Sequence, residues 1–136
     1  MRIQIVALFV RLLLGLIFFW QGFGKVFTWG IDAVYNNSFK PFEDTFLPEF
    51  VLKPTVYFTS IVEFLGGLLL IIGLFRKQVY YLFAFVLLIV AFGHGLQSPI
   101  WDLQHVFIRS VLLVFLMMLF DKDSLNLDRF IKKVNN

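Results

Sequence analysis

The sequence predicts an all-α, polytopic membrane protein whose single domain, residues 1–136, is a bundle of four transmembrane helices. Of its 136 residues 60% are hydrophobic and 15% are charged, whereas soluble domains are roughly one quarter charged. The chain contains 19 Phe, which is more aromatic surface than a core of this size can bury away from water. Four apolar stretches reach the roughly 20 residues that a helix needs to cross a bilayer core of about 30 Å.

We expect the four helices at residues 3–24, 56–75, 79–96 and 101–120. The uninterrupted apolar part of the fourth begins only at Val106. The first stretch follows a basic residue, as a signal peptide does, but Arg11 interrupts its apolar run and no small-residue cleavage site follows Trp20. We therefore expect the first stretch to remain as a membrane helix.

The connections between these helices differ in length. Residues 75–78 form a tight turn, which makes the second and third helices an antiparallel hairpin. Residues 26–55 are much longer, with Pro41, Pro48 and Pro54 expected to break helices. The same segment is rich in aromatic residues: Phe27, Trp29, Tyr35, Phe39, Phe42, Phe46 and Phe50. Aromatic rings favour the headgroup zone, so we expect an outer loop that lies at the interface and caps the bundle.

Basic residues in the connections predict the orientation of the chain in the membrane. One side receives Arg2, Arg76, Lys77, Lys122, Arg129, Lys132 and Lys133, and the other receives Lys25, Lys40 and Lys53. The richer side is expected to be cytoplasmic, which places both termini in the cytoplasm and the protein in a bacterial cytoplasmic (inner) membrane. The net charge of +3 reflects this asymmetry, and we expect no nucleic-acid partner because no basic run is interleaved with aromatic residues outside the membrane.

Several kinds of chemistry are disfavoured by the residues that the chain contains. It has no cysteine, which excludes thiol relay and thiolate metal sites. His94 and His105 are its only histidines, and we expect no metal site. The sequence has no glycine-rich phosphate loop, nucleophile elbow or His-Glu-x-x-His motif. We therefore assign no catalytic residues and expect no catalytic activity of the chain on its own.

Each apolar stretch carries one ionisable residue, and these are Arg11, Glu63, His94 and Arg109. Such a group in a membrane helix costs about 2.5 to 3.5 kcal/mol on insertion scales, so it usually faces a partner or a wet cavity. Glu63 lies roughly 12 Å below the outer end of its expected helix. Together with two polar residues of the first helix, these groups predict a polar vestibule in the outer half of the bundle: Arg11, Gln21, Lys25, Glu63, His94 and Arg109.

Small residues share faces with these polar groups. Gly15 and Gly22 follow Arg11 at helical spacing, and Gly66 and Gly67 follow Glu63. Glycine lets two helix backbones approach closely, so these four positions are expected to pack helices together. The packing is either within one chain or between copies in a homo-oligomer.

The polar residues have two interpretations. In the first, Glu63 pairs with Arg11 or Arg109 and fixes the order of the helices. In the second, the cations that exceed the single carboxylate bind a ligand with an acidic or oxygen-rich head and an apolar tail. A quinone, a fatty acid, a lipid phosphate or a small oxyanion has this chemistry.

Three patterns in the chain carry a resemblance to a known family. They are Arg11-x-x-x-Gly15-x-x-Phe18-x-x-x-Gly22-x-x-Lys25, then Glu63-x-x-Gly66-Gly67 followed by Gly73-Leu74-Phe75, and the tail Ser124-Leu125-Asn126-Leu127-Asp128. These patterns resemble the DoxX family of small four-helix membrane proteins. The tail departs from the family's usual Gly-rich turn, having Asp121-Lys122-Asp123 instead.

The resemblance implies a four-helix membrane fold and a choice between two functions. One is a membrane subunit or assembly partner that binds membrane lipids and another membrane or membrane-associated protein. The alternative is a quinone-linked redox subunit of a membrane oxidoreductase complex, because the family name comes from a thiosulfate oxidoreductase that reduces quinone. No cofactor is evident in the sequence, and in the alternative the bound group is the quinone, with electrons supplied by a partner.

Overall fold

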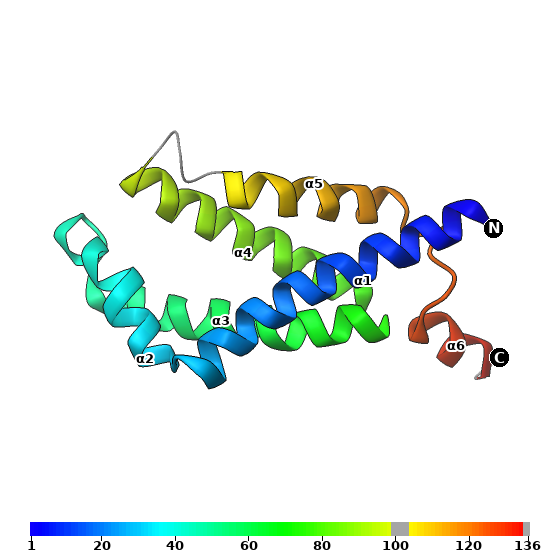
Figure 1. Ribbon diagram of the computed structural model, residues 1–136, viewed down its shortest axis with the longest axis horizontal. Helices are drawn as coiled ribbons and strands as arrows, with labels where there is room; N and C mark the ends of the chain where they lie inside the picture. The colour runs from blue at the N-terminus through cyan, green and yellow to red at the C-terminus, as the bar shows by residue number, and fades with distance from the viewer. Residues whose placement is uncertain (99–103, 135–136) are drawn as a thin grey trace.

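The computed structural model describes residues 1–98 and 104–134. Four principal helices form a bundle: α1 (Arg2–Phe23), α3 (Glu49–Ile72), α4 (Arg76–Gln97) and α5 (Gln104–Met118). They alternate in direction, and each packs on the next, with α5 also packing on α1 (Figure 1). The buried core between them includes Leu14, Phe18, Leu70, Phe83 and Leu116. The all-α bundle predicted from the apolar stretches is confirmed.

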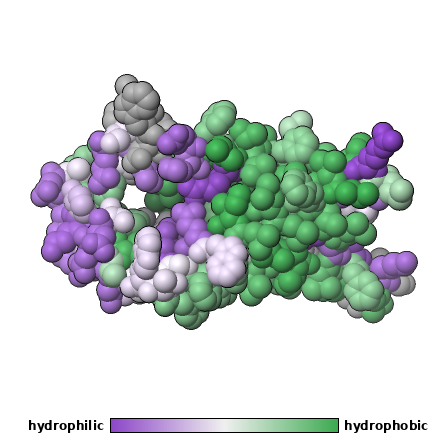
Figure 2. Space-filling model, in the orientation of Figure 1, coloured by the Kyte–Doolittle hydropathy of each residue, from purple (hydrophilic) through white to green (hydrophobic). Residues whose placement is uncertain are grey.

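Within the described residues, three helices are long and apolar enough to cross a membrane: α1 with its continuation to Thr28, α3 and α4. The 15 residues of α5 span about 22 Å, which is shorter than the expected helix over 101–120. Residues 101–103 of that expectation lie outside the described residues, and a turn follows α5. Hydrophobic residues cover the middle of the bundle, whereas hydrophilic residues gather at its two ends (Figure 2).

The ends of α3 differ from the expected range 56–75. The helix begins at Glu49 after Pro48, and Pro54 lies inside it, so the expectation that Pro54 breaks the helix is wrong. Pro54 stands in the second turn, where its missing N–H costs one backbone hydrogen bond. At the other end the left-handed Gly73 (φ 74°) stops the helix, with the amides of Gly73 and Leu74 donating to the carbonyl of Leu69. Only glycine adopts this conformation without steric cost.

The long connection after α1 folds into short helical turns. These are η1 (Gly24–Thr28), α2 (Ile31–Val34), η2 (Tyr35–Phe39) and η3 (Lys40–Asp44). We call residues 24–48 the cap, and the end of the bundle that they cover the cap end. The cap has a small core of its own with the start of α3, formed by Val34, Tyr35, Phe42, Leu52 and Val56. Figure 1 shows the cap beyond one end of the bundle.

Both described termini lie at the opposite end, which we call the tail end (Figure 1). After α5 the chain turns at Leu119, whose carbonyl accepts from the amides of Lys122 and Asp123. It then returns toward α3 and α4 and forms the short helix α6 (Leu127–Val134). The tail, residues 119–134, therefore contacts helices that precede it by more than 40 residues in the chain.

The tightest helix contact joins α1 and α3. A Cβ atom placed on Gly22 would lie 2.2 Å from the backbone nitrogen of Phe64, and one on Gly67 would lie 2.4 Å from that of Phe19. At Gly15 the nearest atoms belong to Ile71 and Gly67, and at Gly66 they belong to the ring of Phe83. All four glycines thus lie at contacts within one chain.

Candidate functional site

Polar side chains from α1, its continuation η1, α3 and α5 converge near the cap end of the bundle. They are Gln21 of α1, Lys25 of η1, Ser60 and Glu63 of α3, and Arg109 of α5, which together we call the cap-end site. Gln21 and Lys25 are four residues apart, and Ser60 and Glu63 are three apart, so each pair shares a helix face. The sequence placed Gln21, Lys25, Glu63 and Arg109 in one vestibule, and the structure brings these four together.

The one carboxylate of the cap-end site forms an ion pair with a lysine. Lys25 Nζ lies 2.6 Å from Glu63 Oε2, and the side chain of Lys25 is 17% exposed while that of Glu63 is fully buried. Lys25 therefore lies at the rim and Glu63 at the floor. The expected pairing of Glu63 with Arg11 is wrong. Its direct ion pair is with Lys25, which the continuation of α1 as a π-helix keeps beside α3, whereas Arg109 interacts with Glu63 electrostatically without forming a direct ion pair.

Arg109 enters the site from α5 and is held by neutral groups. Its Nη1 donates to Gln21 Oε1 over 2.5 Å, and its Nε donates to the carbonyl of His105 over 2.8 Å. The guanidinium also lies 5.8 Å from the centre of the Phe18 ring. Among the described residues no carboxylate lies within 4.0 Å of it. Arg109 is thus a nearly buried cation, 8% exposed, without a direct counterion in the described part of the chain.

Two buried oxygen atoms of the site lack a hydrogen-bond partner within the described residues. They are Ser60 Oγ and Glu63 Oε1, and both residues are 0% exposed. A buried polar group without a partner costs about 1 to 3 kcal/mol. The site therefore has a surplus cation and two buried oxygen atoms without hydrogen-bond partners in the described residues.

Arg11 does not belong to this site, which corrects the sequence-based vestibule. It lies toward the tail end, where its Nε is 2.9 Å from Asp123 Oδ2. Its Nη1 donates to the carbonyls of Leu70 and Ile71 at the end of α3. The last carbonyls of a helix lack intrahelical partners, and the Leu70 carbonyl accepts, besides the bond from Arg11, a long bond of 3.2 Å from the C-cap amide of Gly73. Arg11 of α1 therefore caps α3 from outside.

Arg11 is part of a second polar group, which we call the tail cluster: Arg11, Arg76, Asp123, Asn126 and Asp128. Arg76 Nη1 lies 2.9 Å from Asp123 Oδ2. Asp128 accepts from the backbone amides of Phe75 and Arg76, which are the first free donors of α4. Two arginines and two aspartates thus neutralise each other and join the tail to α1, α3 and α4.

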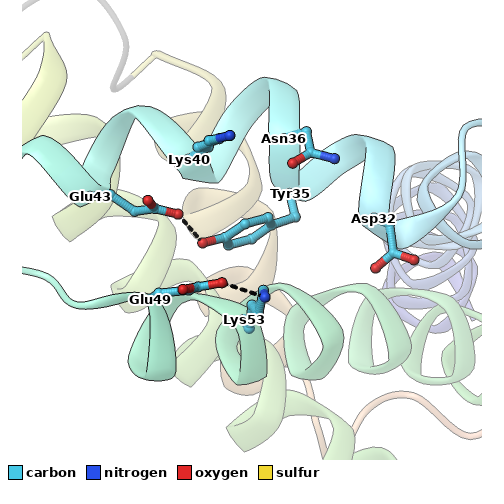
Figure 3. A pocket seen from close by; sticks show the side chains of 7 residues that line it. All are labelled: Asp32, Tyr35, Asn36, Lys40, Glu43, Glu49 and Lys53. Atoms are coloured by element: carbon cyan, nitrogen blue, oxygen red, sulfur yellow. Dashed lines mark hydrogen bonds and ion pairs between the residues drawn. The ribbon is translucent and has the colours of Figure 1, made fainter.

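The cap carries an open polar cleft of about 380 Å³. Figure 3 shows that its side chains face one another: Tyr35 donates to Glu43, and Glu49 pairs with Lys53. Its Asp32 accepts a hydrogen bond from Tyr57. The hydrogen bond to Glu43 raises the pKa of Tyr35 to about 12. Because these side chains form hydrogen bonds and an ion pair with one another, we interpret the cleft as a structural contact that holds the cap together.

The two histidines lie near the cap end, His94 in the last turn of α4 and His105 in the first turn of α5. Within the described residues there is no group of three or more His, Asp or Glu side chains that is arranged to hold a metal ion.

Comparison with known families gives the identity of this fold. The model of the DoxX family matches residues 6–95, which extend from the start of α1 almost to the end of α4. The chain belongs to the DoxX family. Searches of curated proteins and of solved structures found no match. The matched range of this DoxX protein includes Lys25, Ser60 and Glu63, whereas Arg109 and the tail lie beyond it. It is an integral membrane protein with several long apolar helices.

The partners of Arg11 were not predicted from the sequence. A cation in the half of α1 near the tail end requires a carboxylate from the same end, and Asp123 is one of the few acidic residues there. Arg76 was assigned only to a turn, although it lies at the point where the tail returns. The sequence feature that predicts the tail cluster is the location of these charged residues at the same surface of the membrane.

Proposed function

We propose that this DoxX protein is a membrane subunit that binds an amphiphile with an acidic or oxygen-rich head in its cap-end site. The observation that carries the proposal is the nearly buried Arg109, which has no carboxylate within ion-pair distance among the described residues. Lys25 and Glu63 neutralise each other, so the site retains one positive charge. A buried charge without a partner is costly, and an anionic head offsets this cost.

The two oxygen atoms without hydrogen-bond partners indicate which head group of the ligand fits the site. Glu63 Oε1 accepts hydrogen bonds only, whereas Ser60 Oγ both accepts and donates. A head that carries an anionic or carbonyl oxygen for Arg109 and a hydroxyl for Glu63 satisfies all three groups. Fatty acids meet the first requirement, and hydroxylated phospholipid heads such as that of phosphatidylglycerol meet both.

Entry is expected at the rim beside Lys25, which is the most exposed charged side chain of the site. The apolar tail of the ligand then lies against the lipid-facing surface of the helices, in the region where Trp20 is 62% and Phe27 is 61% exposed. A site of this kind suits a subunit that presents a lipid to a membrane protein partner. We place the protein in a bacterial cytoplasmic membrane with the tail end cytoplasmic, as its basic residues indicate.

A quinone is the second candidate ligand, and the same two oxygen atoms favour it. A quinol hydroxyl donates to Glu63 Oε1, and a quinone carbonyl accepts from Ser60 or Arg109. When bound, the quinone supplies the redox chemistry. The residues of this chain then position its head and hold a proton at Glu63. The electrons come from a partner protein, and the chain is a quinone-linked subunit of a membrane oxidoreductase.

Ligand-induced thermal shifts of the detergent-purified protein test the proposal. The probes are oleate, phosphatidylglycerol, decylubiquinone and, as a neutral reference, phosphatidylcholine. A ligand at 100 times its Kd stabilises the folded state by about 2.7 kcal/mol. An acidic probe that raises the Tm of the wild type supports lipid binding, and a shift by decylubiquinone alone supports the quinone subunit.

Two variants assign the shift to the cap-end site. Ser60→Ala removes a hydroxyl that has no partner in the described residues, so the Tm without ligand stays unchanged while the ligand-induced shift falls. Arg109→Gln removes the surplus charge and abolishes the shift by acidic probes. Thr59→Val is the matched control, because Thr59 is equally buried but its hydroxyl donates to Val56. Equal ligand-induced shifts in Ser60→Ala, Arg109→Gln and Thr59→Val contradict the proposal.

A further inference from the structure

The short helix α6 exposes an apolar stripe along one side. Its apolar side chains are Leu127, Phe130, Ile131 and Val134, and at about 100° of rotation per residue they fall within an arc of about 100°. All four are exposed, Phe130 by 64% and Val134 by 68%. A stripe of this kind on a membrane protein requires either lipid or another protein to cover it.

The opposite side of α6 is basic. Arg129, Lys132 and Lys133 lie there, and Lys122 precedes the helix. The acidic Asp128 does not offset them, because it is bonded to Arg76 and to the first amides of α4. A basic face opposite an apolar stripe is typical of helices that lie in the interface of a membrane with anionic lipids.

The tail cluster fixes where this stripe lies. The amide of Asp128 donates to the carbonyl of Gly73, and Arg11 Nη2 donates to the carbonyl of Leu125 over 2.6 Å. These bonds hold α6 beside the tail end of α3 (Figure 1). The lipid-facing surface of α1 reaches the same end, where Ile3 is 55% exposed. The stripe therefore lies at the same end of the bundle as the exposed apolar start of α1.

A groove of about 480 Å³ lies beside the stripe. Its lining residues are Ser124, Leu125, Asn126, Arg129, Phe130 and Lys133. Arg129 and Lys133 are four residues apart and thus share one side of α6, whereas Leu125 and Phe130 supply an apolar wall. The groove combines two cations with apolar surface, as the head of an anionic phospholipid requires.

We infer that α6 lies in the interface of the leaflet at the tail end, with the phosphate of an anionic phospholipid bound between Arg129 and Lys133 and its acyl chains against Leu125 and Phe130. This contact is separate from the cap-end site, which lies at the other end of the bundle. It anchors the tail on the membrane surface. The tail cluster connects the anchored tail to the ends of α3 and α4.

Spin labels test the placement of α6 in the intact protein reconstituted in bilayers of phosphatidylglycerol and phosphatidylcholine. Because the chain has no cysteine, Phe130→Cys and Lys132→Cys each carry one label, on opposite sides of α6. The label at 130 is expected to collide with oxygen and to be protected from a water-soluble nickel reagent, and the label at 132 is expected to show the reverse. Equal exposure of both labels to the nickel reagent overturns the inference, and so does protection of the label at 130 from both reagents, which indicates a protein partner.

Native mass spectrometry tests the choice of lipid. Each basic residue near an anionic surface contributes about a fivefold preference, so Arg129→Gln/Lys133→Gln lowers the retained ratio of phosphatidylglycerol to phosphatidylcholine by about 25-fold. Lys133→Gln alone, which removes no described hydrogen bond, lowers it by about fivefold and guards against misfolding of the double variant. The control Lys40→Gln/Lys53→Gln makes the same change of charge at the cap end, where neither lysine lines the tail groove, and is expected to lower the ratio less than the tail double variant does.

The tail variants separate this inference from the cap-end proposal. Arg109→Gln is expected to reduce lipid bound at the cap-end site and to leave the dependence on Arg129 and Lys133 intact. A retained lipid ratio that is the same in wild type and in both tail variants overturns the tail site, whatever the result for Arg109→Gln.

Discussion

Replacing Gly22 by alanine tests the close contact of α1 with α3, on which the geometry of the cap-end site depends. The added Cβ would lie 2.2 Å from the nitrogen and 2.5 Å from the Cα of Phe64, whereas ordinary contact begins at 3.4 Å. The obstacle is backbone, so the two helices must separate by about 1 Å. Overpacking of this kind costs about 1 to 3 kcal/mol, and the better helix propensity of alanine returns at most about 1 kcal/mol.

We therefore expect Gly22→Ala to lower the free energy of unfolding by about 2 kcal/mol. Gly66→Ala is expected to cost less, because the added Cβ meets only the edge of the Phe83 ring, which can shift. Gly95→Ala is the control, since a Cβ there meets no described atom within 4 Å and alanine is expected to be neutral or slightly stabilising. The double variant Gly22→Ala/Gly67→Ala costs less than the sum of its parts, because one separation of the helices relieves both clashes.

The assay is unfolding in mild detergent followed by far-ultraviolet circular dichroism, with the oligomeric state of each variant measured in parallel. If Gly22→Ala and Gly95→Ala unfold alike, the close approach of α1 and α3 is refuted. If Gly22→Ala changes the oligomeric state while leaving stability intact, the glycine packs between copies of the chain rather than within one.

Three further expectations concern the tail cluster, the cap and the orientation of the chain. Asp123→Asn leaves two buried arginines short of a counterion and should cost about 3 to 5 kcal/mol of unfolding free energy, whereas the exposed Asp121→Asn should cost little; equal losses contradict the cluster. The pKa of Tyr35 is raised from 10.0 to about 12, so the stabilising effect of its hydrogen bond to Glu43 is complete below about pH 10 and is lost as the pH rises toward 12. A pH series of thermal unfolding in which Tyr35→Phe behaves like the wild type refutes this. A cysteine at Lys40 should react with an impermeant reagent added outside cells and one at Lys77 should not, and the reverse result inverts the assigned orientation.

The helices were predictable from the sequence, but their ends were not. Apolar length decides whether a segment can span a membrane, so each expected stretch became a helix in the structure. The ends depend on local conformations that composition does not show. Gly73 adopts a left-handed conformation that stops α3 early, and Pro54 is tolerated because it lies close to the start of that helix. The helical turns of the cap depend on packing between Phe42 and the start of α3, which no periodicity reveals.

Four of the cap-end residues, Gln21, Lys25, Glu63 and Arg109, were predicted together because helical spacing gives the faces and chain direction gives the depth, whereas Ser60 was not assigned to the vestibule. The pairing within the group was not predictable, because choosing between Lys25, Arg11 and Arg109 as the partner of Glu63 needs the crossing of α1 over α3. Arg11 was assigned to the wrong site because its counterion lies in the tail. The position of Asp123 depends on the turn after α5, which sequence spacing alone does not fix.

The central claim is that the cap-end site binds an amphiphile with an acidic or oxygen-rich head. Native mass spectrometry of the detergent-purified protein, with lipidomic identification of what is bound, tests it most directly when wild type and Arg109→Gln are compared. We predict a specific acidic lipid or quinone on the wild type that is reduced or absent in Arg109→Gln, because the variant loses the nearly buried cation that has no direct counterion among the described residues. The absence of any bound species from both proteins, with Arg109→Gln only less stable, would contradict the claim and leave Arg109 as a structural partner of Gln21 and the carbonyl of His105.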